Sequence, residues 1–252
     1  MTGSLLIRAL EPNVAEAARE SLAAQADCDI AAVAALLADP TRATMLLSLL
    51  DGRIRPASEL ARLGRVTAAT ASEHLAKLVG GRLVAVEPHG RFRYYRLANS
   101  RLAEALETLA TIAPGRQVVG FRERQSASAI RQARLCYDHL AGTLGVRVTE
   151  ALVAERAIAL EDRAFLLSEN AHAVFGDLGI DVEALRRARR LLGRACLDWS
   201  ERRYHLAGPL GVAFASRLLE LSWIERTPEP RVLRVTNAGR RALKTRFGVR
   251  LF

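Results

Sequence analysis

The sequence predicts a mainly α-helical chain with short β-hairpins, built from more than one folded module. Its 252 residues exceed the length of an average domain, which is about 100 to 200 residues. Half of the residues are apolar and a quarter are charged, and this composition supports buried cores. Apolar residues recur at helical spacing in the first half of the chain, and two stretches of the second half repeat one another.

The N-terminal part predicts an arm followed by four helices. An Ala- and Glu-rich stretch places a helical arm in residues 1–28, which would pack on the rest of the chain or on a second subunit. The second helix after the arm begins at Asp39-Pro40, because Asp suits an N-cap and Pro suits the first helical position. Thr67 is the expected N-cap of the fourth. The four helices are expected over 30–37, from 40 to about 50, over 57–63, and from 68 to about 79.

The elements that follow complete a known supersecondary pattern. The third and fourth helices, joined through Gly64, form a helix-turn-helix. Residues 83–87 and 91–97 alternate as two strands around a Pro-His-Gly turn and predict a wing. An amphipathic helix over 100–113 follows. We therefore expect a winged helix-turn-helix domain over residues 29–114.

Four segments of this domain carry a family resemblance. Leu37-Ala-Asp-Pro-Thr-Arg42, Ser58-Glu-Leu-Ala61, Thr67-Ala-Ala-Thr-Ala-Ser-Glu-His-Leu-Ala-Lys-Leu78 and Gly90-Arg-Phe-Arg-Tyr-Tyr-Arg-Leu97 resemble the ArsR/SmtB family of regulators. The resemblance covers well under half of the chain. It implies a dimeric winged helix that acts as a transcriptional regulator, expected to be a repressor, on a double-stranded DNA operator. It also implies that the fourth helix enters the major groove and that an effector alters the affinity for DNA.

The exposed face of the fourth helix supplies the expected DNA contacts. Leu75, Leu78 and Val79 must face the core. At the wing, Arg91 and Arg93 suit contacts with phosphates or the minor groove. His74 lies at the border of the groove face, either as a core-edge histidine or as a phosphate contact. The remaining groove-face residues are Thr67, Ala68, Ala69, Thr70, Ser72, Glu73 and Lys77.

The sequence departs from the family at the positions where many members sense metals. Ile54-Arg-Pro-Ala57 stands where those members carry cysteines, and residues 100–113 lack the Asp/His pattern of the dimer-helix zinc sites. Ala68 and Glu73 also replace a longer polar and a basic residue, so base reading would depend on few hydrogen bonds. Any effector site must therefore lie elsewhere in the chain.

The second half contains an internal duplication. The segment His139-Leu-Ala-Gly-Thr-Leu-Gly-Val146 aligns with His205-Leu-Ala-Gly-Pro-Leu-Gly-Val212, and Cys136-Tyr-Asp138 aligns with Cys196-Leu-Asp198. Six additional residues separate the cysteine and histidine of the second copy. We expect residues 115–252 to form a sensing or dimerisation region of two winged-helix-like repeats, each ordered helix, helix, hairpin, helix.

The duplicated elements supply a candidate metal or thiol-switch site. Thiolates, carboxylates and imidazoles together suit zinc, arsenite or another thiophilic ion. In a purely structural alternative, each cysteine is a core residue and each aspartate caps a helix or pairs with an arginine such as Arg134 or Arg194. In a redox alternative, the two repeat cysteines oxidise or pair, whereas acidic neighbours make Cys28 a poor nucleophile. The candidate residues are Cys136, Asp138, His139, Cys196, Asp198 and His205.

Charge and motifs bound the remaining possibilities. The net charge of +10 and the pI near 10.6 favour a polyanionic partner, and the second half carries +9 of that charge. The chain lacks known catalytic motifs and an apolar run that could span a membrane, so we expect a cytoplasmic regulator that is not an enzyme. A winged helix fused to an enzyme or assembly domain is the alternative from another class. An organic effector could instead bind an aromatic pocket lined by Trp199, Tyr204, Phe214 and Trp223.

Overall fold

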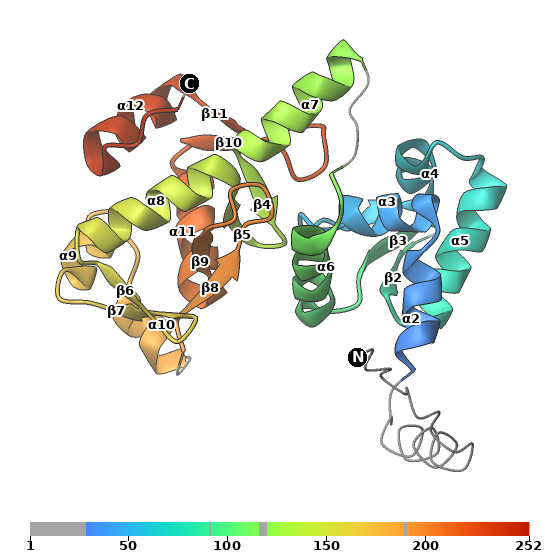
Figure 1. Cartoon of the computed structure of the whole chain (residues 1–252), viewed down its shortest axis with the longest axis horizontal. Helices are drawn as coiled ribbons and strands as arrows, with labels where there is room; N and C mark the ends of the chain where they lie inside the picture. Colours follow the sequence, from blue (N-terminus) through green and yellow to red (C-terminus); the bar gives the residue numbers. More distant parts are fainter. Residues whose placement is uncertain (1–28, 91, 116–119, 189–190, 252) are drawn as a thin grey trace, which may run out of the picture.

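The computed structural model describes residues 29–90, 92–115, 120–188 and 191–251 (Figure 1). The expected N-terminal arm, Cys28 and Arg91 therefore lie outside the described residues. The helices are α2 (Ile30–Leu37), α3 (Pro40–Ser48), α4 (Ala57–Gly64), α5 (Ala68–Gly80), α6 (Ser100–Ile112), α7 (Phe121–Gln132), α8 (Gly142–Ala154), α9 (Ala171–Gly176), α10 (Val182–Ala188), α11 (Gly208–Glu220) and α12 (Asn237–Phe247). The strands are β1 (Arg55–Pro56), β2 (Val84–His89), β3 (Phe92–Leu97), β4 (Arg134–Cys136), β5 (His139–Ala141), β6 (Ile158–Glu161), β7 (Ala164–Leu167), β8 (Gly193–Leu197), β9 (Tyr204–Ala207), β10 (Ile224–Arg226) and β11 (Leu233–Val235).

Elements α2 to α6 form the expected winged helix-turn-helix, and local capping determines where its helices begin. The Asp39 carboxylate accepts a hydrogen bond from the Arg42 amide at 2.9 Å, and Pro40 is the first residue of α3. The Thr67 hydroxyl accepts from the Thr70 amide at 3.2 Å at the start of α5. A buried apolar cluster joins the helices to the wing, centred on Met45, Leu60, Leu75, Leu78 and Leu97.

Two details of this domain differ from the expectation. The wing strands extend to His89 and Phe92, which pair with each other, so Pro88 lies in β2 rather than in the turn. This is possible because β2 is an edge strand in the order β1-β3-β2, where a missing amide donor leaves no ladder bond unmade. The apolar face of α2 is also only partly buried: Leu36 and Leu37 pack against the apolar cluster of this domain, whereas Ile30 is 74% exposed.

The C-terminal region is a duplication, as expected, but in each copy a β-hairpin separates the first two helices. The first copy runs α7-β4-β5-α8-β6-β7-α9, and the second runs α10-β8-β9-α11-β10-β11-α12. Within the first hairpin, Tyr137 adopts a left-handed backbone conformation with φ of 63°, which a helix does not allow. Strand pairing between β7 and β8 then joins the two copies in one sheet of order β6-β7-β8-β9.

The glycines of the repeated segments hold each hairpin against the helix that follows it. Gly142 and Gly208 have φ of 77° and 78°, and these values favour glycine. A Cβ at Gly145 would lie 2.5 Å from the Leu140 carbonyl oxygen, and one at Gly211 would lie 2.5 Å from that of Leu206. Close approach of strand and helix in both copies therefore requires the Leu-Ala-Gly-x-Leu-Gly pattern.

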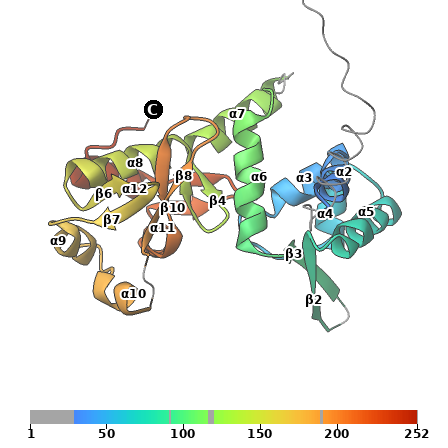
Figure 2. The same ribbon diagram turned by 60° about the horizontal axis from the view of Figure 1, so that its bottom comes forward.

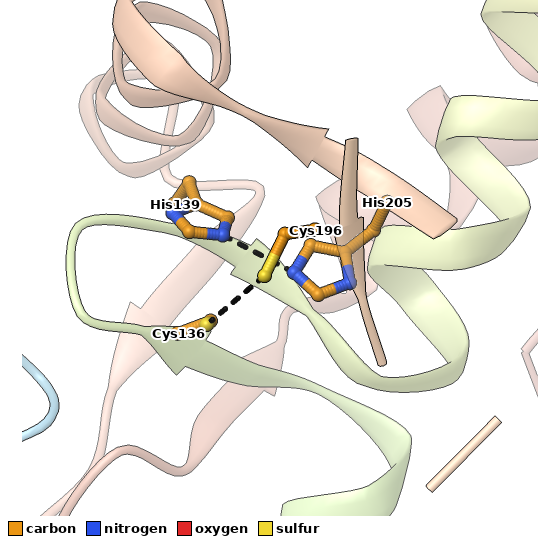
Figure 3. Close-up of side chains that lie close together, drawn as sticks. All are labelled: Cys136, His139, Cys196 and His205. Carbon is orange, nitrogen blue, oxygen red and sulfur yellow. Dashed lines mark hydrogen bonds between the residues drawn. The ribbon is translucent and has the colours of Figure 1, made fainter. Parts of the chain in front are cut away.

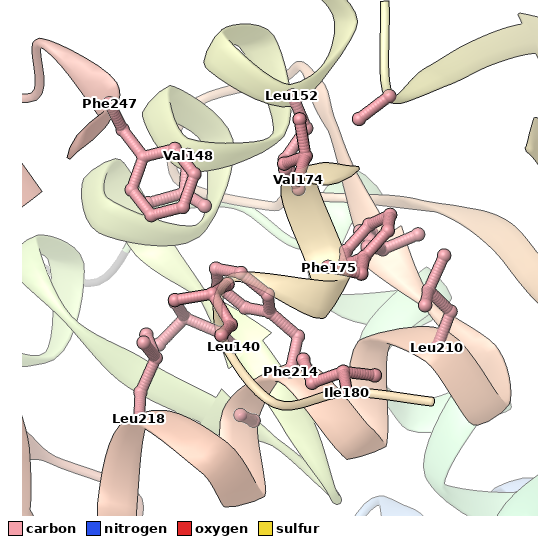
Figure 4. Packing of buried hydrophobic residues seen from close by; sticks show 14 of the residues in the cluster. Leu140, Val148, Leu152, Val174, Phe175, Ile180, Leu210, Phe214, Leu218 and Phe247 are labelled. Carbon is pink, nitrogen blue, oxygen red and sulfur yellow. The ribbon is translucent and has the colours of Figure 1, made fainter. Parts of the chain in front are cut away.

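One apolar core is shared by the two copies (Figure 4). The Phe214 ring of α11 lies between Phe175 of α9 and Phe247 of α12, with centroid distances of 6.4 and 6.0 Å in edge-to-face arrangements. Figure 2 shows α6 standing between this region and the rest of the winged helix. Within the described ranges, no single helix is long and apolar enough to cross a membrane, although α2 and α3, bent by 90° at their junction, reach that length and hydropathy together.

Candidate functional site

Two hairpins from the two copies bring four potential metal ligands together (Figure 3). Cys136 and His139 are cross-strand partners in β4–β5, and Cys196 and His205 are cross-strand partners in β8–β9. The two Sγ atoms are 3.8 Å apart, and the two Nε2 atoms are 3.2 Å apart. One ligand atom from each residue lies within 4.8 Å of the other three. We name these four residues the Cys2His2 cluster.

Two of the six spacings among these atoms can be compared directly with a tetrahedral site, and both agree with it. With Zn–S bonds of about 2.3 Å and Zn–N bonds of about 2.05 Å, the edges of a tetrahedron are about 3.8 Å between sulfurs and about 3.3 Å between nitrogens. The distances between the sulfurs and between the nitrogens are 3.8 and 3.2 Å. A mixed pair of thiolates and imidazoles in this geometry suits zinc and related ions.

Each imidazole of the Cys2His2 cluster has a carboxylate behind it. The Asp138 carboxylate is hydrogen-bonded to His139 Nδ1 at 3.0 Å, whereas the Asp198 carboxylate lies 3.4 Å from His205 Nδ1 without a hydrogen bond to it. A carboxylate favours the proton on Nδ1 and leaves the Nε2 lone pair free. Two lone pairs would then face each other across 3.2 Å, which is unfavourable unless a cation or a shared proton lies between them.

The two aspartates therefore take a different place from the one that the sequence indicated. Neither belongs to the group of atoms that could share one ion, and both instead contact the outer nitrogen of a histidine. Asp198 also pairs with Arg134 at 2.9 Å, as the structural alternative predicted. Arg194 instead pairs with Glu104 of α6. The two cysteines and two histidines come together because each copy contributes one cysteine and one histidine.

Asp198 is the centre of a buried polar network. Neither its side chain nor that of Arg134 is exposed to solvent. The carboxylate also accepts hydrogen bonds from the Gly142 amide at 2.7 Å and from the Ser200 hydroxyl at 2.7 Å. Although burial alone raises the pKa of this carboxyl, the Arg134 charge and these hydrogen bonds hold it well below its usual value. Asp198 is therefore an ionised group that positions His205 and the start of α8.

The protonation of the Cys2His2 cluster reflects its burial. Contact with Cys196 and burial raise the pKa of the Cys136 thiol. Burial opposes charging of His139, but the neighbouring Cys136 and Asp138 outweigh it and raise its pKa to about 9. Burial and the charge of His139 lower the pKa of His205. His139 is thus charged and His205 neutral, so one proton can lie between the two Nε2 atoms, where a metal cation would replace it.

A cavity gives access to the Cys2His2 cluster. It has a volume of about 720 Å³ and lies between α6 and the C-terminal region. Cys136, His139 and Cys196 lie on its wall, opposite Ala103 and Glu104 of α6. An ion can therefore reach the thiols from solvent.

The expected DNA-contact residues lie together on the outer face of α5 and on the wing. His74 is largely buried, with Nδ1 3.7 Å from the Asp39 carboxylate, a position that favours a core-edge role. Thr67 is engaged in capping, and its hydroxyl lies 2.9 Å from that of Thr70, which is half-buried. Arg91 lies outside the described residues. The exposed members are Thr67, Ala68, Ala69, Ser72, Glu73, Lys77 and Arg93.

The four aromatic residues of the expected organic pocket are dispersed. Phe214 belongs to the shared core, and the Trp199 ring lies under the Arg134 guanidinium at 4.5 Å. Tyr204 and Trp223 pack at the edge of that core. Three of the four residues therefore contribute to core packing, and an organic effector site formed by them stays a prediction.

Sequence reasoning missed a buried charge network at the boundary between the two regions. Asp51, Arg55, Glu107 and Arg231 are all buried there. Arg231 pairs with Glu107 of α6, although 124 residues separate them. A charged residue inside an apolar helical pattern, such as Glu107 in α6, was the one local signal available.

The fold, its exposed α5 and its wing define a winged helix-turn-helix DNA-binding protein, and comparison with known proteins gives its family. Residues 39–86 match the model for bacterial regulatory proteins of the arsR family. The chain is 44% identical over 223 residues to the uncharacterized HTH-type transcriptional regulator YdfF of Bacillus subtilis, and the alignment covers 88% of this chain and 99% of that protein. The chain belongs to the ArsR family of transcriptional regulators.

A metal-sensing protein is among the similar proteins, although it aligns with only about a third of this chain. The regulator CmtR of Mycobacterium tuberculosis is 45% identical over 76 residues, which are 30% of this chain and 64% of that protein. The NMR structure of the cadmium metal-sensor CmtR from Mycobacterium tuberculosis has 35% identity and a TM-score of 0.30, covering 36% of this chain and 98% of that chain. These alignments cover too little of the chain to include both copies of the duplication.

Proposed function

We propose that the chain is a homodimeric repressor whose affinity for operator DNA changes when a zinc-class ion binds the Cys2His2 cluster. The main observation behind this proposal is that two sulfurs at 3.8 Å and two imidazole nitrogens at 3.2 Å lie within 4.8 Å of one another, spacings that a tetrahedral zinc site can hold. When bound, the ion would crosslink the two copies of the duplication. The protein would act in the cytoplasm, where its DNA target lies.

The ligand set favours zinc or cadmium over arsenite. Two thiolates and two imidazoles in a tetrahedron are typical of zinc sites, whereas a trivalent arsenical would leave the histidines unused. Four protein ligands also fill the coordination shell, which is typical of sites that organise a fold and leave no open position for catalysis. The proposed role of the ion is therefore to fix the arrangement of the two copies, and not to catalyse a reaction.

Exposed apolar side chains support the dimer. Ile30 of α2 and Ile112 of α6 are 74% and 78% exposed, and Val33 and Leu109 accompany them. Apolar faces of this kind are commonly covered by a partner. A two-fold dimer would place two copies of α5 on half-sites about one helical turn, roughly 34 Å, apart.

DNA binding with and without metal tests this function. Fluorescence anisotropy would follow the chelator-treated protein on DNA from upstream of its own gene, alone and with Zn²⁺ or Cd²⁺. We expect salt-sensitive binding and a metal-dependent change in Kd of about fivefold or more. Tight DNA binding that neither ion changes would remove the metal-responsive part of the proposal. Absence of DNA binding in all samples would favour the enzyme or assembly alternative.

A thiol switch is a second candidate, because the two Sγ atoms are 3.8 Å apart. Their movement to the disulfide distance of about 2.05 Å would remove both thiolates from the Cys2His2 cluster. Contact with Cys196 and burial raise the pKa of the Cys136 thiol, which makes it a poor nucleophile towards an oxidant while no metal is bound. Release of DNA by peroxide in metal-free protein would support the switch instead.

Replacement of Arg93 by alanine is expected to weaken binding to all DNA sequences by a similar factor. Arg93 is exposed on the wing, where its charge would neutralise one phosphate. The slope of log K against log salt should fall by about 1. Arg156→Ala, which removes an exposed arginine of the C-terminal region, is the matched control. A change in sequence preference without a change in slope would mean that Arg93 reads bases.

A further inference from the structure

We infer that the turn between Cys136 and His139 transmits metal binding to the winged helix, with Tyr137 as the positioning residue. This inference rests on the proposed function, and it concerns how that site is coupled to DNA binding. The turn holds two of the four ligands. The same turn is also the place where the C-terminal region enters the core of the winged helix.

Tyr137 contacts the winged helix through both its backbone and its side chain. Its amide donates a hydrogen bond of 2.5 Å to the carbonyl oxygen of Leu50, which follows α3. Its ring packs against the apolar cluster of the winged helix and not against that of the C-terminal region. A Cβ at Gly52 would lie 3.2 Å from the Tyr137 carbonyl oxygen, so the two backbones are in close contact. Any movement of the turn must therefore displace the segment from Leu50 to Gly52.

This segment is connected to the helix-turn-helix by buried charges. Asp51 is buried and pairs with Arg55 at 2.5 Å. Arg55 in turn pairs with Glu59 of α4, and α4 packs on α5. A shift at Leu50 and Asp51 can thus change the position of α4 and of the α5 helix that it supports.

The base of the hairpin is held, so the movable part is the turn. The Arg231 carbonyl accepts from the Leu135 amide at 2.9 Å, and Arg231 Nε donates to the Leu135 carbonyl at 3.1 Å. Arg231 also pairs with Glu107 of α6. With β4 anchored in this way, a change in the distance between the two hairpins is taken up at Cys136, Tyr137 and His139.

The metal-bound and metal-free states of the protein differ in what lies between the β4–β5 and β8–β9 hairpins. With an ion, the ligand atoms of β4–β5 and β8–β9 are drawn together into one tetrahedron. Without it, the facing Nε2 atoms at 3.2 Å repel each other or share a proton, and the thiols lose their common partner. Metal binding therefore selects one position of the turn, and Tyr137 conveys that position to Leu50.

The test compares Tyr137→Asn with Tyr204→Asn. Asparagine tolerates the left-handed backbone of residue 137 but removes the ring. Tyr204 is the matched control, because it also adjoins a ligand, His205, but packs on the C-terminal core. For each variant, Zn²⁺ affinity would be measured by competition with a chromophoric chelator, and the Kd for DNA by anisotropy with and without Zn²⁺.

We expect Tyr137→Asn to bind Zn²⁺ normally and to bind DNA in the metal-free state, while the ratio of the two DNA Kd values falls close to 1. Tyr204→Asn should keep the wild-type ratio. By linkage, DNA should also cease to change the Zn²⁺ affinity of the Tyr137 variant. A wild-type ratio in Tyr137→Asn would overturn the inference and leave the proposed function intact, whereas a ratio of 1 in the wild type would overturn the proposed function itself. Circular dichroism and thermal unfolding would confirm that both variants are folded.

Discussion

Replacement of Asp198 by asparagine is expected to lower the free energy of unfolding by about 3 to 5 kcal/mol. The change leaves the Arg134 guanidinium without its carboxylate in a position where neither side chain is exposed to solvent. An uncompensated buried charge is costly, because the protein interior replaces little of its hydration. The same change weakens the hydrogen bonds that the carboxylate accepts from Gly142 and Ser200. Urea denaturation followed by circular dichroism measures the loss.

The exposed pair between Arg156 and Glu169 provides the control. Its atoms are 2.8 Å apart, similar to the 2.9 Å of the buried pair, but both side chains are mostly in solvent. Glu169→Gln should therefore change the stability by less than about 1 kcal/mol. Equal effects of the two substitutions would show that water reaches Arg134 and that burial does not set the strength of its ion pair.

The winged helix could be predicted because its boundaries are encoded locally. Asp39 with Pro40 starts α3, and Thr67 starts α5, each through a hydrogen bond within three residues. Gly64 and the alternating wing residues needed no information from distant parts of the chain. The exposure of Ile30 and Val33 could not be predicted, because no helical pattern tells a core from a second surface.

The C-terminal hairpins could not be predicted in the same way. The segment around Cys136 has no Asn-Gly or Asp-Gly turn, and Tyr137 adopts its left-handed conformation where its ring and backbone meet the winged helix. The duplication singled out the two cysteines and two histidines that the structure brings together, but it treated the two aspartates as equivalent. Asp138 is half-exposed, whereas Asp198 is buried against Arg134, which is 64 residues away in sequence. Such a difference arises from tertiary contacts.

The substitution of both cluster cysteines by serine is expected to remove high-affinity binding of zinc-class ions. Serine hydroxyls are not ionised near neutral pH and are poor ligands for these metals, so only the two imidazoles would remain. In the wild type, Zn²⁺ at 1,000 times its Kd should stabilise the fold by about 4 kcal/mol. In Cys136→Ser, Cys196→Ser, the same concentration should leave the unfolding transition unchanged. The visible absorption of bound Co²⁺ should disappear in parallel, because it depends on tetrahedral thiolate coordination.

Graded and matched variants separate this result from a general loss of folding. Asp138→Ala removes only the carboxylate behind His139 and should reduce the metal affinity by about 10- to 100-fold without abolishing it. Cys28→Ser changes the third thiol of the chain and should leave both the affinity and the zinc-dependent stabilisation as in the wild type. Zinc-dependent stabilisation that persisted in the double serine variant would place the ion elsewhere. Because the Cys2His2 cluster joins the β4–β5 hairpin to β8–β9 of the four-stranded sheet, loss of its ion should weaken the contact between that hairpin and the sheet.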